Sequence, residues 1–286
     1  MADIRRCFVL GISLVCVLAL STGCLVSPYT AQKKNDVPGL VAMAEDTEAN
    51  LERVREPAVQ ALGELGTQEA KDALISWLEN GAPPDLEEAV YRAAGATGDL
   101  RAVDPLLAAL ESIDRDKTEY EIEPGDQLKL WAVIDGLRGL VDPRVQKALL
   151  AELDAGHSEV IDDVNLSAAL AAQGEAIAPE LEKRLANADD KVFVPAAEAL
   201  GDIYQAAGKQ DRAAQLLKDK KTFRIYAGII TGDVVVDDQL VIDSLNSVGD
   251  AMMAQRLLNT GSAELEAAAK AWAAKHGYTI ETWITP

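Results

Sequence analysis

The chain has 286 residues, a formal net charge of −20 at pH 7 and a hydrophobic content of 49%, whereas aromatic residues make up only 5% of it. This length suffices for one large domain or for an extended array of repeats. So strong a negative charge repels the phosphates of nucleic acids, which excludes nucleic acid as a partner. With so few aromatic residues, the core must consist of Ala, Leu and Val, which suit closely packed helices.

The first 23 residues have the pattern of an export signal. Arg5 and Arg6 precede an apolar run, Cys7–Leu20, which is shorter than the about 20 residues that a membrane-spanning helix requires. A basic start, a short apolar middle and small residues before a cleavage site are typical of a signal peptide. We therefore expect residues 1–23 to be removed from the mature protein.

The cysteine that follows this segment predicts a lipid anchor. Ser21-Thr22-Gly23-Cys24 resembles the lipobox of bacterial lipoproteins, with Ser21 where Leu is commonest. The resemblance implies that Cys24 is lipidated and becomes the new N-terminus; an ordinary cleaved signal and an uncleaved anchor are the alternatives. By similarity to lipoprotein sorting, Leu25 in place of Asp favours the outer membrane, at its periplasmic face, over an inner-membrane or extracellular position.

The rest of the chain is expected to fall into three parts. Residues 24–38 are polar and bounded by prolines, which predicts a flexible tether behind the lipidated N-terminus. Residues 39–277 carry apolar side chains with the 3.6-residue period of helices, and residues 278–286 form a short C-terminal tail. Two stretches interrupt the helical part: an acidic insertion at 111–126, and residues 222–240, where a helix with a loop and a short hairpin are both open.

Apolar positions in the helical part repeat along the chain. The first helix of three successive units carries Ala58, Ala61, Leu62 and Leu65; Val90, Ala93, Ala94 and Thr97; and Val133, Gly136, Leu137 and Leu140. The second helix carries Leu74, Ile75 and Leu78; Leu106, Leu107 and Leu110; and Leu149, Leu150 and Leu153. Each set lines one face of a helix, and looser copies follow up to about residue 258. Repeated helical pairs predict an all-α fold, a right-handed α-solenoid of about six pairs.

The turns within these pairs carry a family resemblance. At residues 98–101 (GDLR) and 141–144 (VDPR) the sequence looks like HEAT repeats, of the short bacterial kind known from phycobilin lyases. Gly there ends one helix, Asp caps the next, and Pro presets its first turn. The resemblance covers about residues 50–260. Residues 200–217 are also similar to a tetratricopeptide repeat, with Ala197 where Trp is commonest.

No short motif in the sequence identifies a catalytic or metal site. His276 is expected in the last turn of a helix, where a cation favours the helix dipole. His157 is expected in an acidic loop between helices, and a metal site that it shares with Asp154 and Glu159 is the alternative. Residues 114–116 (DRD) begin like a calcium loop, but the Gly and Glu that an EF-hand requires do not follow at its spacing.

The sequence therefore predicts no catalytic residue, no metal and no cofactor, and Cys24 is its single site residue. Trp77 and Trp131 are expected in the core or along a groove. The HEAT resemblance implies a protein-binding scaffold or adaptor of the bacterial cell envelope, anchored by its lipid, with partners along the solenoid groove and no enzymatic activity. An enzyme accessory or lyase-like HEAT protein and an acidic, cation-binding envelope component are the alternatives.

Overall fold

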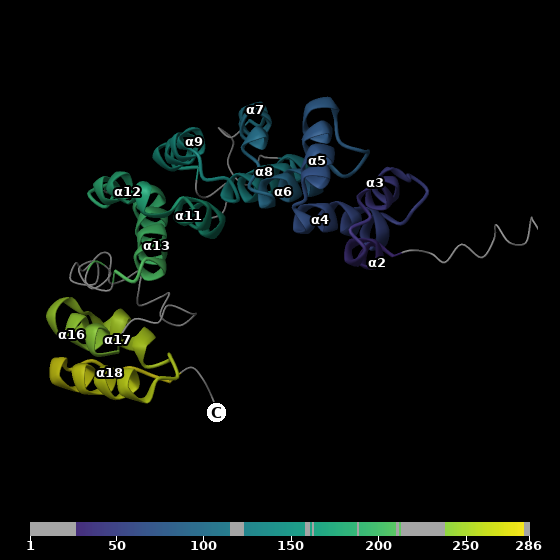
Figure 1. The fold of residues 1–286 in the computed structure, drawn as a ribbon. Coiled ribbons are helices and arrows are strands. Elements are labelled where there is room, and N and C mark those ends of the chain that lie inside the picture. The colour runs from purple at the N-terminus through teal and green to yellow at the C-terminus, as the bar shows by residue number, and fades with distance from the viewer. Residues whose placement is uncertain are drawn as a thin grey trace, which may run out of the picture. The chain divides into compact units, whose positions relative to one another are not determined.

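The computed structural model describes residues 27–114, 123–157, 163–187, 189–209 and 238–282, together with Ile161 and Arg212. Every regular element within these residues is a helix (Figure 1), which confirms the predicted all-α class. None of the described helices is both long and apolar enough to cross a membrane. The chain divides into two compact units, Met1–Ala93 and Ala94–Pro286.

The first unit consists of short helices around an aliphatic core. Its elements are α2 (Pro28–Lys33), α3 (Val37–Glu45), the π-helical turn η1 (Leu51–Arg55), α4 (Glu56–Leu65), α5 (Gln68–Asn80) and the larger part of α6 (Glu87–Ala96). Helices α4 and α5 pack against each other as the first predicted pair, while α2 and α3 pack on each other and on α4. Leu40, Leu62 and Leu74 are at most 1% exposed.

The second unit contains the end of α6, the second helix of that pair and the pairs that follow. Its elements are η2 (Leu100–Ala102), α7 (Val103–Ser112), α8 (Pro124–Arg138), α9 (Pro143–Asp154), α11 (Asp163–Ala171), η3 (Gly174–Ala176), α12 (Ala178–Arg184), α13 (Asp190–Ala206), α16 (Asp238–Val248), α17 (Ala251–Leu257) and α18 (Ala263–His276). Helix α7 packs on α8 and α9, α11 packs on α8 and α13, and α16 and α17 both pack on α18.

The predicted apolar columns supply most of this core. Leu106, Leu137 and Leu149 are fully buried. Leu107 and Leu150 belong to the same columns but are only half-buried. The second helix of a pair therefore buries one edge of its apolar face and leaves the other edge accessible, which the spacing alone did not distinguish.

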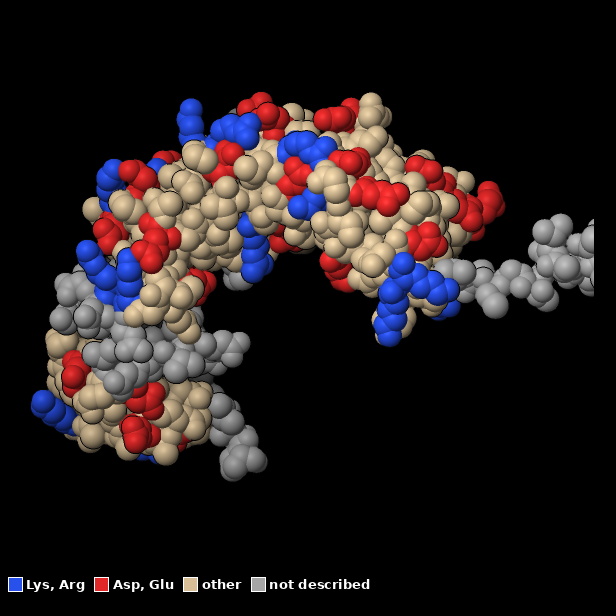
Figure 2. Space-filling model, viewed as in Figure 1, with Lys and Arg blue, Asp and Glu red and all other residues tan. Residues whose placement is uncertain are grey.

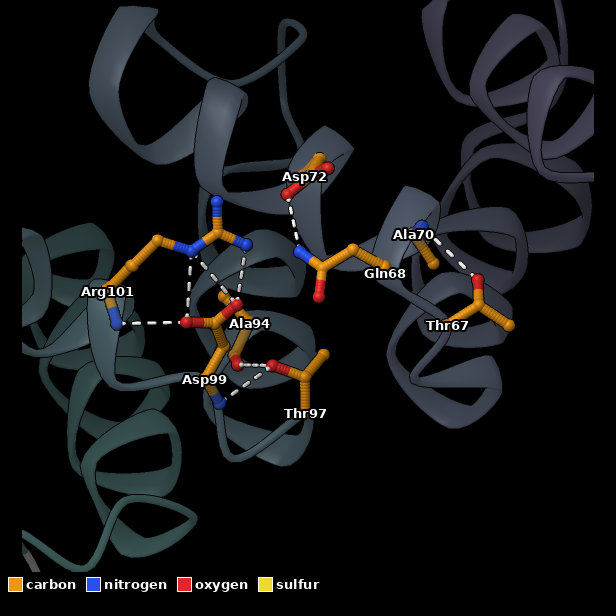
Figure 3. Close-up of polar contacts among 8 residues, drawn as sticks. All are labelled: Thr67, Gln68, Ala70, Asp72, Ala94, Thr97, Asp99 and Arg101. Atoms are coloured by element: carbon orange, nitrogen blue, oxygen red, sulfur yellow. Dashed lines mark hydrogen bonds and ion pairs between the residues drawn. The ribbon is translucent and has the colours of Figure 1, made fainter.

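Polar side chains fix the helix ends in the turns that carry the family resemblance. Figure 3 shows the turn of the first pair, between α4 and α5, and then one of the resembling turns, at residues 98–101. In the first, Gly66 ends α4 with φ +55°, and the Oγ1 of Thr67 accepts a 3.3 Å hydrogen bond from the amide of Ala70 at the start of α5. In the second, Asp99 Oδ1 accepts a 3.0 Å bond from the amide of Arg101 and also binds its guanidinium. The Asp99 cap is the one that the resemblance predicts, and Thr67 fills the same role in the first pair.

The described part of the expected tether is helical. Ser27 caps α2 through a 3.3 Å bond from the amide of Thr30, and Pro28 occupies its first turn. Ala31 is fully buried, and Gln32 donates a 2.6 Å bond to Glu64 of α4. The prediction of a flexible tether through residue 38 overlooked this Ser-Pro start signal, which is typical of a helix N-terminus.

Several predictions concern residues outside the described ranges. The signal segment with Cys24 and Leu25 lies there, as do residues 115–122 of the acidic insertion and residues 222–237 of the second interruption. The described ends of both interruptions are helical, because α8 begins at Pro124 and α16 at Asp238. The described part of the tail is held to α17, since Gln255 accepts a 2.9 Å bond from the amide of Glu281.

Candidate functional site

A groove of about 420 Å³ runs between α7 and α9 in the second unit. Its lining residues are Leu107, Leu110 and Glu111 of α7, and Arg144, Lys147, Ala148, Ala151 and Glu152 of α9. Each set follows the three- and four-residue spacing of one helix face, so two second helices of adjacent pairs form its walls. The floor is apolar, and the alanines leave the space that larger side chains would fill.

One end of the groove is cationic, and its arginine is held in place. Asp142 Oδ1 accepts bonds from the amide and the Nε of Arg144, at 2.8 and 2.9 Å. Arg144 Nη1 also donates to Asp104 of α7 at 2.6 Å, which ties the two walls together. Lys147, one turn further along α9, forms no ion pair with a described residue.

The same contacts perturb the charges of this turn. The side-chain and then the backbone hydrogen bonds from Arg144 hold the pKa of Asp142 below its ordinary value. The bond to Asp142 raises the pKa of Arg144 in turn. Asp142 and Arg144 therefore stay ionised over a wider pH range than the isolated side chains would.

The other end of the groove is acidic and contains a Glu–His pair. Glu152 is 6% exposed, and its Oε2 lies 2.7 Å from Nδ1 of His157. The local backbone explains this contact. Gly156, with φ +73°, ends α9, and the amide of His157 returns to the carbonyl of Glu152 at 3.1 Å. In this type of helix end, the second residue after the C-cap is brought back beside the last turn of the helix.

Of the two residues that would share a metal site with His157, only Asp154 is described, and it is paired with another residue. Asp154 binds Arg184 of α12, at 2.6 Å between Oδ1 and Nε. Glu159 lies outside the described residues. The described part of the chain contains no group of three His, Cys, Asp or Glu side chains that could hold a metal ion.

The other sequence candidates that the structure describes do not line the groove. His276 ends α18, where its Nδ1 lies 2.8 Å from the carbonyl of Trp272 and its ring stacks on that indole at 4.2 Å. Trp77 is buried in the first unit, with its Nε1 3.4 Å from Glu45. Trp131 is half-buried in α8, and its buried Nε1 has no hydrogen-bond partner among the described residues. Asp114 is described, whereas Asp116 is not.

Sequence reasoning missed Glu152 as a groove residue. Glu152 is surrounded by acidic residues in a chain with 47 of them, so its charge carries no signal by itself. The usable signal is Gly156, because a glycine that ends a helix places the following residue beside the last turn. That rule pairs position 157 with position 152.

Comparisons with known proteins agree with the repeat architecture. A family model described as HEAT repeats matches residues 37–123. The Bilin biosynthesis protein PecE of Nostoc sp. (strain PCC 7120 / SAG 25.82 / UTEX 2576) is 38% identical over 93 residues, which are 32% of this chain and 35% of that protein. The protein of the same name from Mastigocladus laminosus is 38% identical over 79 residues, 28% of this chain and 29% of its own. The chain thus spans about a third of the length of these relatives, and no solved structure matches it.

These relatives contradict the prediction that the chain is not an enzyme. Their name places them in bilin biosynthesis, so an enzymatic role is open to a chain that is similar to them. The prediction rested on the lack of a short catalytic motif in the sequence. In a repeat protein, however, the side chains of a site come from different helices, and no short motif records such a site. The capped helical pairs and the family match agree on a HEAT-like repeat architecture over residues 37–123.

Proposed function

We propose that this protein binds a segment of a partner protein in the groove between α7 and α9, while a lipid on Cys24 holds it at a bacterial membrane. The observation that carries the binding proposal is the order of side chains along the groove. An apolar floor of Leu107, Leu110, Ala148 and Ala151 lies between a cationic and an acidic end. Extended surfaces between stacked helical repeats are the usual binding sites of solenoid proteins.

The charge order defines what the groove would accept. Arg144 and Glu152 lie eight residues apart on α9, which corresponds to about 12 Å along a helix. A complementary segment carries an acidic side chain near Lys147, apolar side chains in the middle and a basic side chain near Glu111. Such complementarity sets the direction of the bound segment and disfavours the reverse one.

Site-specific photocrosslinking in the native host tests this proposal. A photoreactive benzophenone amino acid at Ala148 lies in the groove, whereas the same amino acid at the exposed Ala108 of α7 lies outside it. We expect position 148 to form an adduct with a discrete protein and position 108 to form none. Lys147→Glu should weaken that adduct several-fold, because it reverses the charge at the cationic end. Identical adducts at both positions would remove the groove from the proposal.

The lipid anchor is tested on the mature N-terminus. Mass spectrometry of the protein isolated from its native membranes should find Cys24 at the N-terminus with an attached diacylglycerol. Cys24→Ser is expected to release the chain from the lipid-modified fraction. An unmodified Cys24, or cleavage at another residue, would show that the segment is an ordinary signal or an anchor.

A step of bilin biosynthesis is a second candidate function, favoured by the names of the two relatives. A linear tetrapyrrole is a large apolar molecule with two carboxylates, and Arg144 and Lys147 offer cations beside an apolar floor. Titration of the full chain with biliverdin should then shift the visible absorption of the pigment, and Arg144→Gln with Lys147→Gln should weaken the shift. An unchanged pigment spectrum at saturating protein would count against this candidate.

A further inference from the structure

Helix α2 has one buried face and one exposed face of distinct chemistry. Pro28 and Ala31 are buried where the helix packs on α3 and α4. Tyr29 is 62% exposed, and Lys33, four residues later on the same face, is exposed as well. The exposed face therefore consists of an aromatic ring and a cation, and the equally exposed Lys34 follows at the end of the helix.

The two lysines form a basic patch on a strongly acidic chain. Lys33 Nζ lies 4.3 Å from the centroid of the Tyr29 ring, a cation–π contact. Neither lysine forms an ion pair with a described residue. The nearby carboxylates are engaged elsewhere, since Asp36 accepts a 3.0 Å bond from the amide of Gly39 and Glu64 binds Gln32. Figure 2 shows the blue atoms of this patch gathered over α2, at the start of the described chain.

The position of α2 in the sequence limits its distance from a lipid on Cys24. Three residue steps separate Cys24 from Ser27, the cap of α2. Even a fully extended chain covers only about 10 Å over three steps. A lipid that is inserted in a bilayer would therefore hold α2 within about the depth of the headgroup layer.

From these observations we infer that Tyr29, Lys33 and Lys34 lie on the anionic lipid surface of the membrane, and this inference rests on the proposed attachment through Cys24. Tyrosine is enriched at membrane interfaces, where its apolar ring and its polar hydroxyl both lie at the level of the headgroups. Lysines extend their stems along apolar surface and keep the ammonium at the headgroups. Each lysine near an anionic surface contributes about 1 kcal/mol, which corresponds to about a fivefold change in occupancy.

The net charge of the whole chain makes this contact selective. A chain with a formal charge of −20 is repelled by anionic headgroups over most of its surface. The α2 patch is attracted, so the two effects together would hold this end of the first unit against the bilayer.

Amine labelling on vesicles tests the inference. The full chain, isolated from its native membranes, is reconstituted into vesicles of phosphatidylcholine alone or with about 30% phosphatidylglycerol. A membrane-impermeant acylating reagent is applied, and the modified lysines are quantified by mass spectrometry. Lys275 of α18 is an exposed lysine that forms no ion pair with a described residue, and it serves as the internal control.

We expect the phosphatidylglycerol vesicles to reduce the labelling of Lys33 and Lys34 at least about fivefold relative to Lys275, and the effect to be lost in high salt. If the protein floats with the vesicles but all three lysines react alike, the inference is wrong while the attachment stands. Equal protection on phosphatidylcholine alone would also refute an anionic surface as the partner. If the protein does not float, the proposed attachment fails, and the inference fails with it.

Discussion

One aspartate in each of two turns performs two tasks at once. Asp99 and Asp142 both cap the helix that follows and both clamp the arginine two residues later. The cap satisfies an amide that the helix leaves unpaired, and the clamp fixes a guanidinium that would otherwise sample many rotamers. Because Arg144 is fixed in this way, the cationic end of the groove exists before any ligand binds, which lowers the entropic cost of binding.

Replacing Asp142 by Asn tests the charge without removing the cap. The pKa of Asp142 is lowered in the folded state by the bonds from Arg144, so its stabilising effect is present above the ordinary pKa of an Asp and is lost as the pH falls through the folded-state pKa. We expect Asp142→Asn to lower the free energy of unfolding at neutral pH and the difference to shrink in acid. Urea denaturation at a series of pH values measures both. A difference that is independent of pH would show that the charge of Asp142 does not contribute.

At the scale of the elements, the last residues of α6, which belong to the second unit, meet α8 backbone to backbone. A Cβ atom built on Gly95 would lie 2.0 Å from the carbonyl oxygen of Gly136, and one on Gly139 would lie 2.3 Å from that of Gly95. The three glycines thus permit an approach that no side chain allows. The first two units carry Ala61 and Ala93 at the place of Gly136, so a glycine there permits a closer crossing in the third unit.

Gly95→Ala should therefore force α6 and α8 apart. The typical cost of overpacking is about 1–3 kcal/mol, and a backbone obstacle places this variant at the upper end. Gly125→Ala is a matched control, because it lies in the first turn of α8 and a Cβ there meets nothing within 4 Å. The control should leave the stability unchanged or raise it, as Ala favours helix. Chemical denaturation of both variants decides whether the close crossing matters.

For the molecule as a whole, the sequence predicted the features that depend on many buried positions with one period. It did not predict the features that depend on a single local contact. The columns around Leu62, Leu106 and Leu137 fix the all-α repeat fold because burial imposes a period on the residues. The helix at Pro28 and the contact between His157 and Glu152 escaped prediction, since each depends on one local signal within a polar stretch. The groove itself arises from two helices far apart in the sequence, and no pattern within either helix reveals their spacing.

The large negative charge leads to a prediction at the same scale. Repulsion among the charges of a chain at −20 opposes its compact state. Raising the ionic strength from about 0.01 M to about 0.15 M shortens the screening length from about 30 Å to about 8 Å. The free energy of unfolding should therefore rise over this range, as measured by denaturation in sodium chloride. A decrease would mean that individual ion pairs, such as that of Arg184 with Asp154, outweigh the repulsion of the whole chain.

The packing of α2 on α4 shortens the part of the N-terminal segment that could act as a flexible tether. If a lipid is attached at Cys24, a flexible tether through residue 38 would let the protein reach far from the bilayer, whereas a helix from Pro28 onward leaves only the residues before Ser27 to separate the two. A protein attached to a membrane through so short a segment would diffuse in the plane of the membrane and would contact only molecules next to its surface. If Cys24 is the point of lipid attachment, the partners of the protein must approach the membrane surface or already be located there.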